Sequence, residues 1–275
     1  MANGDILPID RSVPEGAQTF VYYTYGGTGI AAVLNTYASN SIPTVGMQGK
    51  RTVGTLHSMA LSYGVNVDDL SAAAMAGFQL EAGLGDACKR GHKLKQDEIG
   101  WFGAPSLGLF GLLTHPNTTQ LVSAGGAWSA LTSSQIAANV NTLINTPRLI
   151  TNKVEMVNTV VLPDAVWVDL SGRPWDTTNS SNGSILDWLM NTHKGVTFKS
   201  SITLDSANHA GTDYAGLNVA VAYNNSPRKA SLVIPLDFTL SPPQWEAFNM
   251  KVYNRSKIGG VKIPYPLSIA IMRGL

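Results

Sequence analysis

The stretch that organises the chain begins VDDLSAAAMAGFQLEAGLGDACKRGHK at Val67 and ends DEIGWFGAPSLGLFGLL at Leu113. In its first part, apolar residues recur at spacings of three and four, as in an amphipathic helix with one stripe against a packed layer (Val67, Leu70, Ala74 and Phe78). Asp68 and Asp69 suit a helix amino terminus, and a basic group suits its carboxyl terminus (Lys89, Arg90, His92 and Lys93). We therefore predict one long helix.

Small residues are unusually frequent in this helix (Ala72, Ala73, Ala74, Ala76, Gly77, Ala82, Gly83, Gly85 and Ala87). Each glycine costs about 1 kcal/mol relative to alanine inside a helix. Their repetition indicates either the close approach of another backbone or a poor helix that tertiary contacts stabilise. The sequence leaves both interpretations open.

The segment from Trp101 to Leu113 places three glycines among aromatic and aliphatic residues, which predicts a buried, glycine-kinked turn. This region resembles the signature of viral major capsid proteins of the Hong Kong 97 fold and of the related encapsulins. The shared features are an alanine-rich helix, an acidic residue, an aromatic-glycine pair, and G-x-x-G-L-L followed by Pro and Asn. The matching positions are Asp97, Glu98, Phe102, Gly103, Gly108, Gly111, Leu112, Leu113, Pro116 and Asn117.

The carboxyl-terminal region carries the second part of the resemblance. A strand over Asn249–Asn254 leads to Arg255, the pair Gly259 and Gly260, and a final apolar strand anchored by Pro266. In the family these strands pack back against the long helix, called the spine helix. Each motif is weak alone, but their order along nearly the whole chain makes the resemblance specific.

The resemblance implies an α+β fold of the Hong Kong 97 type. Its expected parts are an N-terminal arm (1–18), an extended-loop hairpin region (19–66), a peripheral domain with the spine helix (67–127 and 239–275) and an axial domain (128–238). Short strands that alternate with helices predict a mixed sheet flanked by helices in the axial domain.

Within these parts the sequence predicts individual elements. We expect a loop over Thr114–Ser129, a helix capped by Thr132 or Ser133 and ended by Pro147, and a helix capped by Ser184. Buried or alternating apolar runs predict strands at 19–25, 159–162, 197–204, 216–223, 231–238 and 261–271. A turn or helix follows Pro163.

Two segments lack a core of their own. Met1–Gln18 has no period and two prolines, and Tyr37–Gly64 indicates a long hairpin with one irregular arm. A two-stranded hairpin is marginally stable alone, and an arm without a core must find partners elsewhere or stay disordered. We therefore expect both segments to make contacts with neighbouring subunits. We therefore expect deletion of Met1–Gln18 to impair assembly more than folding.

Charged residues form only 13% of the 275 residues, and the net charge is +1. So few charges leave a monomer surface poorly hydrated, which indicates that much of it is covered by other subunits. No broad basic footprint for nucleic acid is present. A local basic run is either a solvated helix end or a face toward a packaged genome or a scaffolding partner (Lys89, Arg90, Lys93 and Lys95).

The sequence offers little for catalysis or cofactors. Cys88 is the only cysteine, the five histidines are scattered, and no G-x-S-x-G, Walker or H-E-x-x-H motif occurs. Asp205, His209 and Asp213 could bind a metal only if they stood on one helix, and Gly211 indicates a loop. We expect no metal, cofactor, enzymatic activity, secretory signal or membrane span.

Residues Gly27–Ala32 match the dinucleotide-binding pattern G-x-G-x-x-A after a predicted strand. However, no acidic residue occurs between Glu15 and Asp68, where the ribose-binding carboxylate should stand. A nicotinamide-dependent oxidoreductase is therefore only a distant alternative.

The resemblance implies the major capsid protein of a tailed bacteriophage or prophage. Such a chain assembles through hexameric and pentameric capsomers into an icosahedral shell around double-stranded DNA, with portal, scaffolding or decoration proteins as further partners. The expected location is the virion, after assembly in the host bacterial cytoplasm. The alternative within the same fold is the shell of an encapsulin-type nanocompartment.

Overall fold

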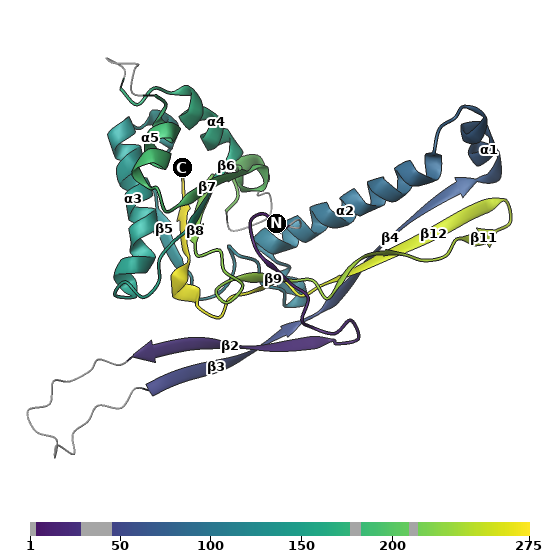
Figure 1. The fold of residues 1–275 in the computed structure, drawn as a ribbon, viewed down its shortest axis with the longest axis horizontal. Coiled ribbons are helices and arrows are strands. Elements are labelled where there is room, and N and C mark those ends of the chain that lie inside the picture. Colours follow the sequence, from purple (N-terminus) through teal and green to yellow (C-terminus); the bar gives the residue numbers. More distant parts are fainter. Residues whose placement is uncertain (1–3, 29–45, 177–182, 209–213) are drawn as a thin grey trace, which may run out of the picture.

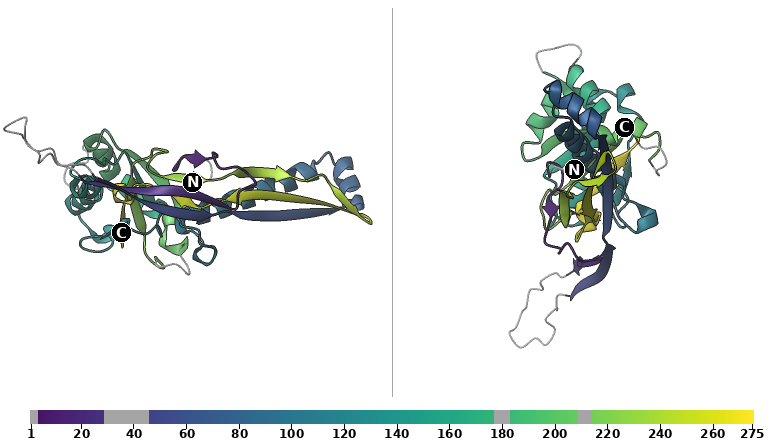
Figure 2. Two further views of the ribbon diagram at one scale, coloured as in Figure 1. Left: turned by 90° about the horizontal axis from the view of Figure 1, so that it is seen from below. Right: turned by 90° about the vertical axis from the view of Figure 1, so that its right-hand side faces the viewer.

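The computed structural model describes residues 4–28, 46–176, 183–208 and 214–275. The molecule is elongated: a rounded unit of helices around a sheet lies at one end, and a long helix with paired strands extends to the other (Figure 1). A separate two-stranded hairpin projects from the middle (Figure 1). Seen from below, the extended part is long and thin (Figure 2).

The expected single helix is two helices, α1 (Val67–Met75) and α2 (Leu80–Phe102). The break follows from Gly77, whose φ of +71° lies in the left-handed region that ends helices. The basic group predicted for the carboxyl terminus lies in the middle of α2, which continues to Phe102. The predicted apolar stripe is also wrong for the protomer, because α1 has no buried residue and Phe78 is 60% exposed.

Close backbone approach does not explain the small residues of this region within one protomer. A Cβ atom added at Gly77, Gly83 or Gly85 would meet no heavy atom within 4 Å. Their environment is open, so α1 and the first half of α2 depend on other contacts for stability.

The extended part of the molecule is built on two long antiparallel strands, β4 (His57–Asn66) and β12 (Asn249–Ile258), which pair over ten positions. β10 (Leu236–Leu240) and β11 (Gln244–Glu246) pair with different parts of the other edge of β12. The second half of α2 packs on β4 and β12 through one stripe of residues (Cys88, His92, Gln96 and Ile99). There the ring nitrogens of His92 lie 2.8 Å from Ser256 Oγ and 2.6 Å from Asn254 Oδ1.

The projecting hairpin is formed by β2 (Thr19–Thr28) and β3 (Gly46–Thr55). The expected hairpin over 37–64 is therefore misplaced: β3 pairs back with β2, and β4 belongs to the sheet of β12. Phe20 and Tyr22 at the base of the hairpin are buried with Leu56 and Val233. This small cluster joins the hairpin to the body.

The rounded unit contains a mixed five-stranded sheet in the order β5-β14-β8-β6-β7 (Figure 1). Its strands are β5 (Thr119–Val122), β14 (Ala270–Arg273), β8 (Val219–Tyr223), β6 (Thr159–Pro163) and β7 (Thr197–Ser201). Alternate residues of β8 enter two different cores: Val219 and Val221 join the end of α2, and Ala220 and Ala222 join the helices. The sheet is thus covered on both faces.

Three helices cover one face of this sheet: α3 (Ser133–Ile150), α4 (Asp164–Gly172) and α5 (Ile185–Thr192). Thr132 and Ser184 cap α3 and α5 as predicted, each within a capping box. Pro147 does not end α3. Its carbonyl still accepts a hydrogen bond from Thr151 N at 3.1 Å, so the last turn forms without the missing proline donor.

Several strand predictions need correction. The predicted loop over 114–129 contains β5. The strand predicted over 197–204 ends at Ser201, and the one over 231–238 divides into β9 (Ser231–Val233) and β10. The strand predicted over 261–271 divides into β13 (Val261–Lys262), a 3-10 turn at Pro266–Ser268 and β14, because prolines interrupt its ladder. β14 pairs with β5 and β8, and its Ile271 shares a core with Ile99 and Phe102 at the end of α2.

The amino-terminal segment is part of the core, which overturns the expectation of an arm without one. Ile6 and Leu7 are buried in the core between the five-stranded sheet and the end of α2, which we call the main core. β1 (Ile9–Asp10) pairs in parallel with β9, and Lys262 Nζ lies 2.7 Å from Asp10 Oδ2. Residues 4–18 therefore find their partners on the same chain.

Candidate functional site

The glycine-rich turn after α2 is a backbone crossing. The amide of Leu112 donates to Gly100 O at 2.8 Å, and that of Leu113 donates to Trp101 O at 3.0 Å. A Cβ atom on Gly111 would lie 2.4 Å from both Gly103 N and Trp101 O. Two segments can lie this close only without side chains, which explains the glycines of the first motif.

The second motif meets the first at this crossing. Gly260, with a φ of +73°, places its Cα so that an added Cβ would lie 2.6 Å from Phe110 O. The amide of Val261 donates to the same Phe110 oxygen at 2.8 Å. Gly259 N donates to Val233 O at 2.9 Å. The structure thus brings together two motifs that lie about 150 residues apart in the sequence.

The remaining motif residues have separate structural roles. Phe102, Leu112 and Leu113 are buried in the main core, and Gly108 takes a left-handed φ at the end of a 3-10 turn. Polar members make local contacts: Thr203 Oγ1 donates to Asp97 at 2.7 Å, Glu98 pairs with Lys95 at 2.7 Å, and Arg255 pairs with Glu15 at 2.6 Å. Pro266 is buried at the start of its 3-10 turn.

A buried contact that the sequence did not reveal joins the hairpin to the crossing. His115 Nδ1 lies 2.9 Å from Pro116 O, a pure acceptor, so Nδ1 carries the proton. Nε2 therefore accepts from Tyr22 Oη at 3.0 Å. Burial lowers the pKa of His115 and raises the pKa of Tyr22 to about 12, so both groups are held neutral.

This contact predicts acid sensitivity. Because the pKa of His115 is lower in the folded state, the unfolded chain binds more protons below about pH 6.5. The free energy of unfolding should therefore fall as the pH drops from about 6.5 toward the folded-state pKa, by at most about 1.4 kcal/mol per pH unit for this one group. His115→Gln should show a shallower dependence in urea titrations at several pH values. Equal slopes for the two proteins would contradict the prediction.

A second buried polar cluster lies beside the carboxyl-terminal strands. Lys229 Nζ pairs with Glu155, whose side chain is buried, and lies 3.9 Å from the ring centroid of Tyr265. The ammonium group thus contacts both a carboxylate and a π face, which compensates for its partial removal from water.

Removing one member of this pair should destabilise the protomer. Glu155→Gln keeps the shape but leaves the lysine without its anion, so we expect a loss of about 2–3 kcal/mol in unfolding free energy. The partial exposure of Lys229 keeps this below the value for a fully buried pair. Chemical denaturation measures it, and the double variant Glu155→Gln with Lys229→Met should recover part of the loss. A double variant as unstable as the sum of the single changes would argue against coupling.

The basic run of α2 does not form one surface. Lys89 lines a groove near the free end of the molecule with Tyr63 and Phe78. Arg90 and Lys93 line a different cleft beside the rounded unit, and Lys95 pairs with Glu98. Successive helix positions differ by about 100° around the axis, so neighbours in sequence face different directions.

Large apolar side chains are exposed at two distant places. At the free end of the extended part, Met75 is 92% and Phe248 is 78% exposed, and Phe78 in the α1–α2 turn and Trp245 in β11 are also exposed. On the hairpin, Val21 and Val53 are cross-strand partners, and both are exposed beside Tyr23. Groups of large exposed apolar side chains typically mark an interface between proteins.

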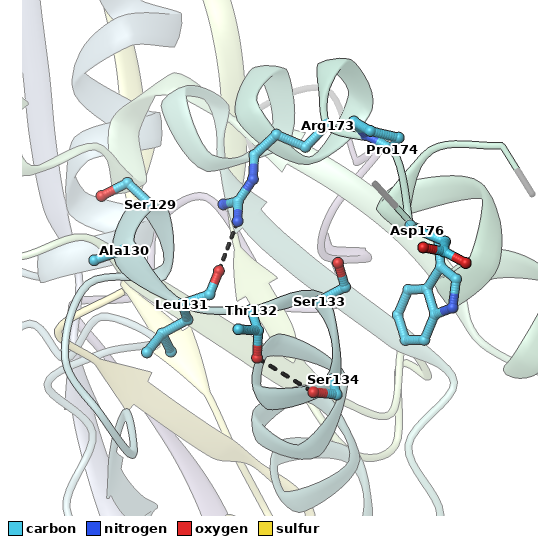
Figure 3. A pocket seen from close by; sticks show the side chains of 10 residues that line it. Ser129, Ala130, Leu131, Thr132, Ser133, Ser134, Arg173, Pro174 and Asp176 are labelled. Atoms are coloured by element: carbon cyan, nitrogen blue, oxygen red, sulfur yellow. Dashed lines mark hydrogen bonds between the residues drawn. The ribbon is translucent and has the colours of Figure 1, made fainter. Parts of the chain in front are cut away.

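The pocket between the start of α3 and the end of α4 is a structural junction (Figure 3). The guanidinium group of Arg173 donates to Leu131 O at 2.6 Å and Trp128 O at 2.9 Å, and it pairs with Asp169 at 2.9 Å. These contacts tie α4 to the turn before α3. Arg173 therefore has a structural role in holding these two helices together.

The structure describes only part of the residues considered for metal or nucleotide binding. Asp205 Oδ1 accepts from Ala165 N at 3.0 Å in the first turn of α4, whereas His209 and Asp213 lie outside the described residues. Gly27 belongs to the antiparallel hairpin, where a dinucleotide fingerprint would need a strand-to-helix turn; residues 29–32 lie outside the described part. In the described ranges, no helix is long and apolar enough to cross a membrane.

Comparison with known proteins agrees with this architecture. A sequence model of the family described as "Major capsid protein" matches residues 29–274. Among curated protein sequences, none matches significantly. The fold is similar to the capsid of Myoviridae phage XM1, with a TM-score of 0.78 and 18% identity over 99% of this chain and 90% of that one.

Two further structures share the fold. The capsid of a native GTA particle has a TM-score of 0.68 at 12% identity, covering 99% of this chain and 89% of that one. The virus-like particle from Pyrococcus furiosus has a TM-score of 0.59 at 13% identity, covering 97% and 89%. The expected α+β fold of the Hong Kong 97 type is confirmed, and the encapsulin alternative gains no better match. Because the family model spans most of the chain, the protein belongs to the major capsid protein family, as its sequence motifs predicted.

Proposed function

We propose that this capsid protein forms an icosahedral shell of hexameric and pentameric capsomers around the double-stranded DNA of a tailed phage. The observation that carries the proposal is the exposure of large apolar side chains at both the hairpin and the free end of one elongated protomer. Two different patches on one molecule favour head-to-tail contacts, which close into rings when the rotation between copies allows it.

We propose that the hairpin of β2 and β3 is the extended loop and that it lies on a neighbouring subunit. Charge supports this role: Lys50 and Arg51 are the only ionic side chains from Gly16 to Asn66. Between Val67 and Cys88 all ionic side chains are acidic (Asp68, Asp69, Glu81 and Asp86). A basic hairpin and an acidic free end are complementary surfaces on opposite parts of the molecule.

The strand pairing favours a particular division into domains. We propose that α1, α2, β4 and β10–β12 form the peripheral domain, and that the five-stranded sheet with α3–α5 forms the axial domain. On this division the last strand, β14, is axial. The role is mechanical, without catalysis or a cofactor: many weak, repeated interfaces add up to a stable container.

The contents and partners of the shell follow from the same proposal. We propose that the chain assembles in the host cytoplasm with portal, scaffolding or decoration proteins and contacts the packaged DNA without sequence specificity. The small net charge of +1 supports weak contact with DNA rather than tight binding.

Size-exclusion chromatography and negative-stain electron microscopy of the purified full chain test the proposal. We expect capsomer rings or closed shells, and absorbance spectra of particles from infected or induced cells should show nucleic acid. A chain that stays monomeric at high concentration would contradict shell formation. Shells that contain a protein cargo and no DNA would support the nanocompartment alternative.

A further inference from the structure

A cleft of about 570 Å³ lies between α2, the amino-terminal segment and the axial sheet. From α2, one helical stripe faces it, made of residues spaced three and four apart (Arg90, Lys93, Leu94 and Asp97). Trp167 of α4, Phe198 and Lys199 of β7, and Ile202 of the following 3-10 turn form the opposite wall. The cleft thus joins two parts of the fold that are distant in sequence.

The apolar part of the cleft is open to solvent. Leu94 and Ile202 are each 67% exposed, although they stand on opposite walls. Trp167, which also lines the cleft, is half-buried, and Phe198 is buried. Two exposed aliphatic side chains that face a shared hollow favour an apolar occupant.

The charged part of the cleft is mainly basic on its α2 side. Arg90 makes no ion pair with any residue in the described ranges. Lys93 stands one turn further along the helix, and Lys199 Nζ donates to Asp5 O from the opposite wall. Two carboxylates also line the cleft: Asp97, which accepts from Thr203 Oγ1, and Asp5. Arg90 is therefore a cation on the same helical stripe as Leu94 that no ion pair within the described ranges neutralises.

We propose that this cleft binds an acidic amphipathic helix of a partner protein. An amphipathic helix binds by laying its apolar face into an apolar groove while its charged edge meets the charged side chains beside the groove. The apolar stripe of such a helix covers Leu94 and Ile202, and its acidic edge meets Arg90. A phosphate backbone would leave the aliphatic side chains uncovered and would face Asp97, so DNA fits less well.

Fluorescence anisotropy with the purified full chain tests this inference. The probe is a labelled synthetic helix of about four turns, with leucine on one face and glutamate elsewhere. Arg90→Glu should weaken binding about tenfold, because it removes an attractive pair and adds a repulsive one. Leu94→Ser should weaken it by a similar factor, since it removes the apolar contact.

Matched controls come from the same helix and from the free end. Lys89→Glu introduces the same charge change one residue away but lines a different groove, and Met75→Ser removes an exposed apolar side chain far from the cleft. Both should leave binding within about twofold, as surface changes outside an interface do. Circular dichroism melts check that all variants fold.

Three results would overturn the inference: equal binding by Arg90→Glu and Lys89→Glu, equal binding of a peptide with lysine in place of glutamate, or no binding at all. Tighter binding of double-stranded DNA than of the peptide, with the same dependence on Arg90, would assign the cleft to the genome instead. The inference does not depend on shell formation. Microscopy of the same sample measures assembly, and anisotropy measures peptide binding, so either proposal can fail without the other.

Discussion

Gly111→Ala is expected to lower the free energy of unfolding by more than about 4 kcal/mol, or to prevent folding altogether. The new Cβ atom would lie 2.4 Å from Gly103 N and from Trp101 O. Both are backbone atoms of the crossing segment, so a side-chain rotation cannot relieve the clash. Relief would require separating the two backbone segments whose contact holds Leu112 and Leu113 in the core.

Gly83→Ala provides a matched control, because it adds the same single carbon atom. A Cβ atom at Gly83 meets no heavy atom within 4 Å, and the residue lies inside α2. Alanine is the better helix former there, so stability should rise by about 0.5–1 kcal/mol. Urea denaturation of both purified variants measures the difference. Similar stabilities for the two would show that the crossing is far more compliant than its geometry indicates.

Leu7→Ala is expected to cost about 2–5 kcal/mol, the range for emptying a fully buried leucine site. Leu7 has no exposed surface and packs in the main core, and Tyr223 Oη donates to the neighbouring Ile6 O. The amino-terminal segment therefore contributes to folding of the protomer itself. Deletion of residues 1–18 should give an unfolded or aggregated chain, which reverses the expectation from sequence that assembly would suffer first.

Thermal and chemical denaturation of Leu7→Ala, together with the solubility of the deletion variant, check this prediction. Arg11→Ala serves as the control in the same segment. Its ion pair with Asp237, at 2.9 Å, is more than half exposed on both sides, so its loss should cost at most about 1 kcal/mol. A deletion variant that folds as stably as the full chain, yet fails to assemble, would restore the idea of an arm held only by neighbours.

The polar contacts around the spine were beyond sequence reasoning for a common reason. His92 meets Asn254 and Ser256 across more than 160 residues, and His115 meets Tyr22 across 93 residues. Each residue type is usually exposed, and its spacing to chain neighbours carries no signal. These side chains come together only because β12 packs against α2 and because β2 packs against the turn that contains His115.

Local rules determined much of the architecture. Capping residues determined where α3 and α5 begin, an unbroken apolar run determined the buried strand β6, and ordered motifs determined the family and the fold. These features depend on neighbours within a few residues, or on motif order, and both can be read directly from the chain. The glycines of the two motifs were also recognised, although their meeting at Phe110 was not.

The tertiary structure alone decided which strands pair and where each end of the chain lies. Alternation of apolar residues specifies a strand but not its partner, so the sequence places β4 in the hairpin and does not reveal that β14 pairs with β5 and β8. The burial of Leu7 likewise depends on surfaces contributed by β8, β9 and the end of α2. Pairing and burial between distant segments are properties of the whole packed molecule. Each depends on which strand edges and apolar surfaces the other segments leave uncovered.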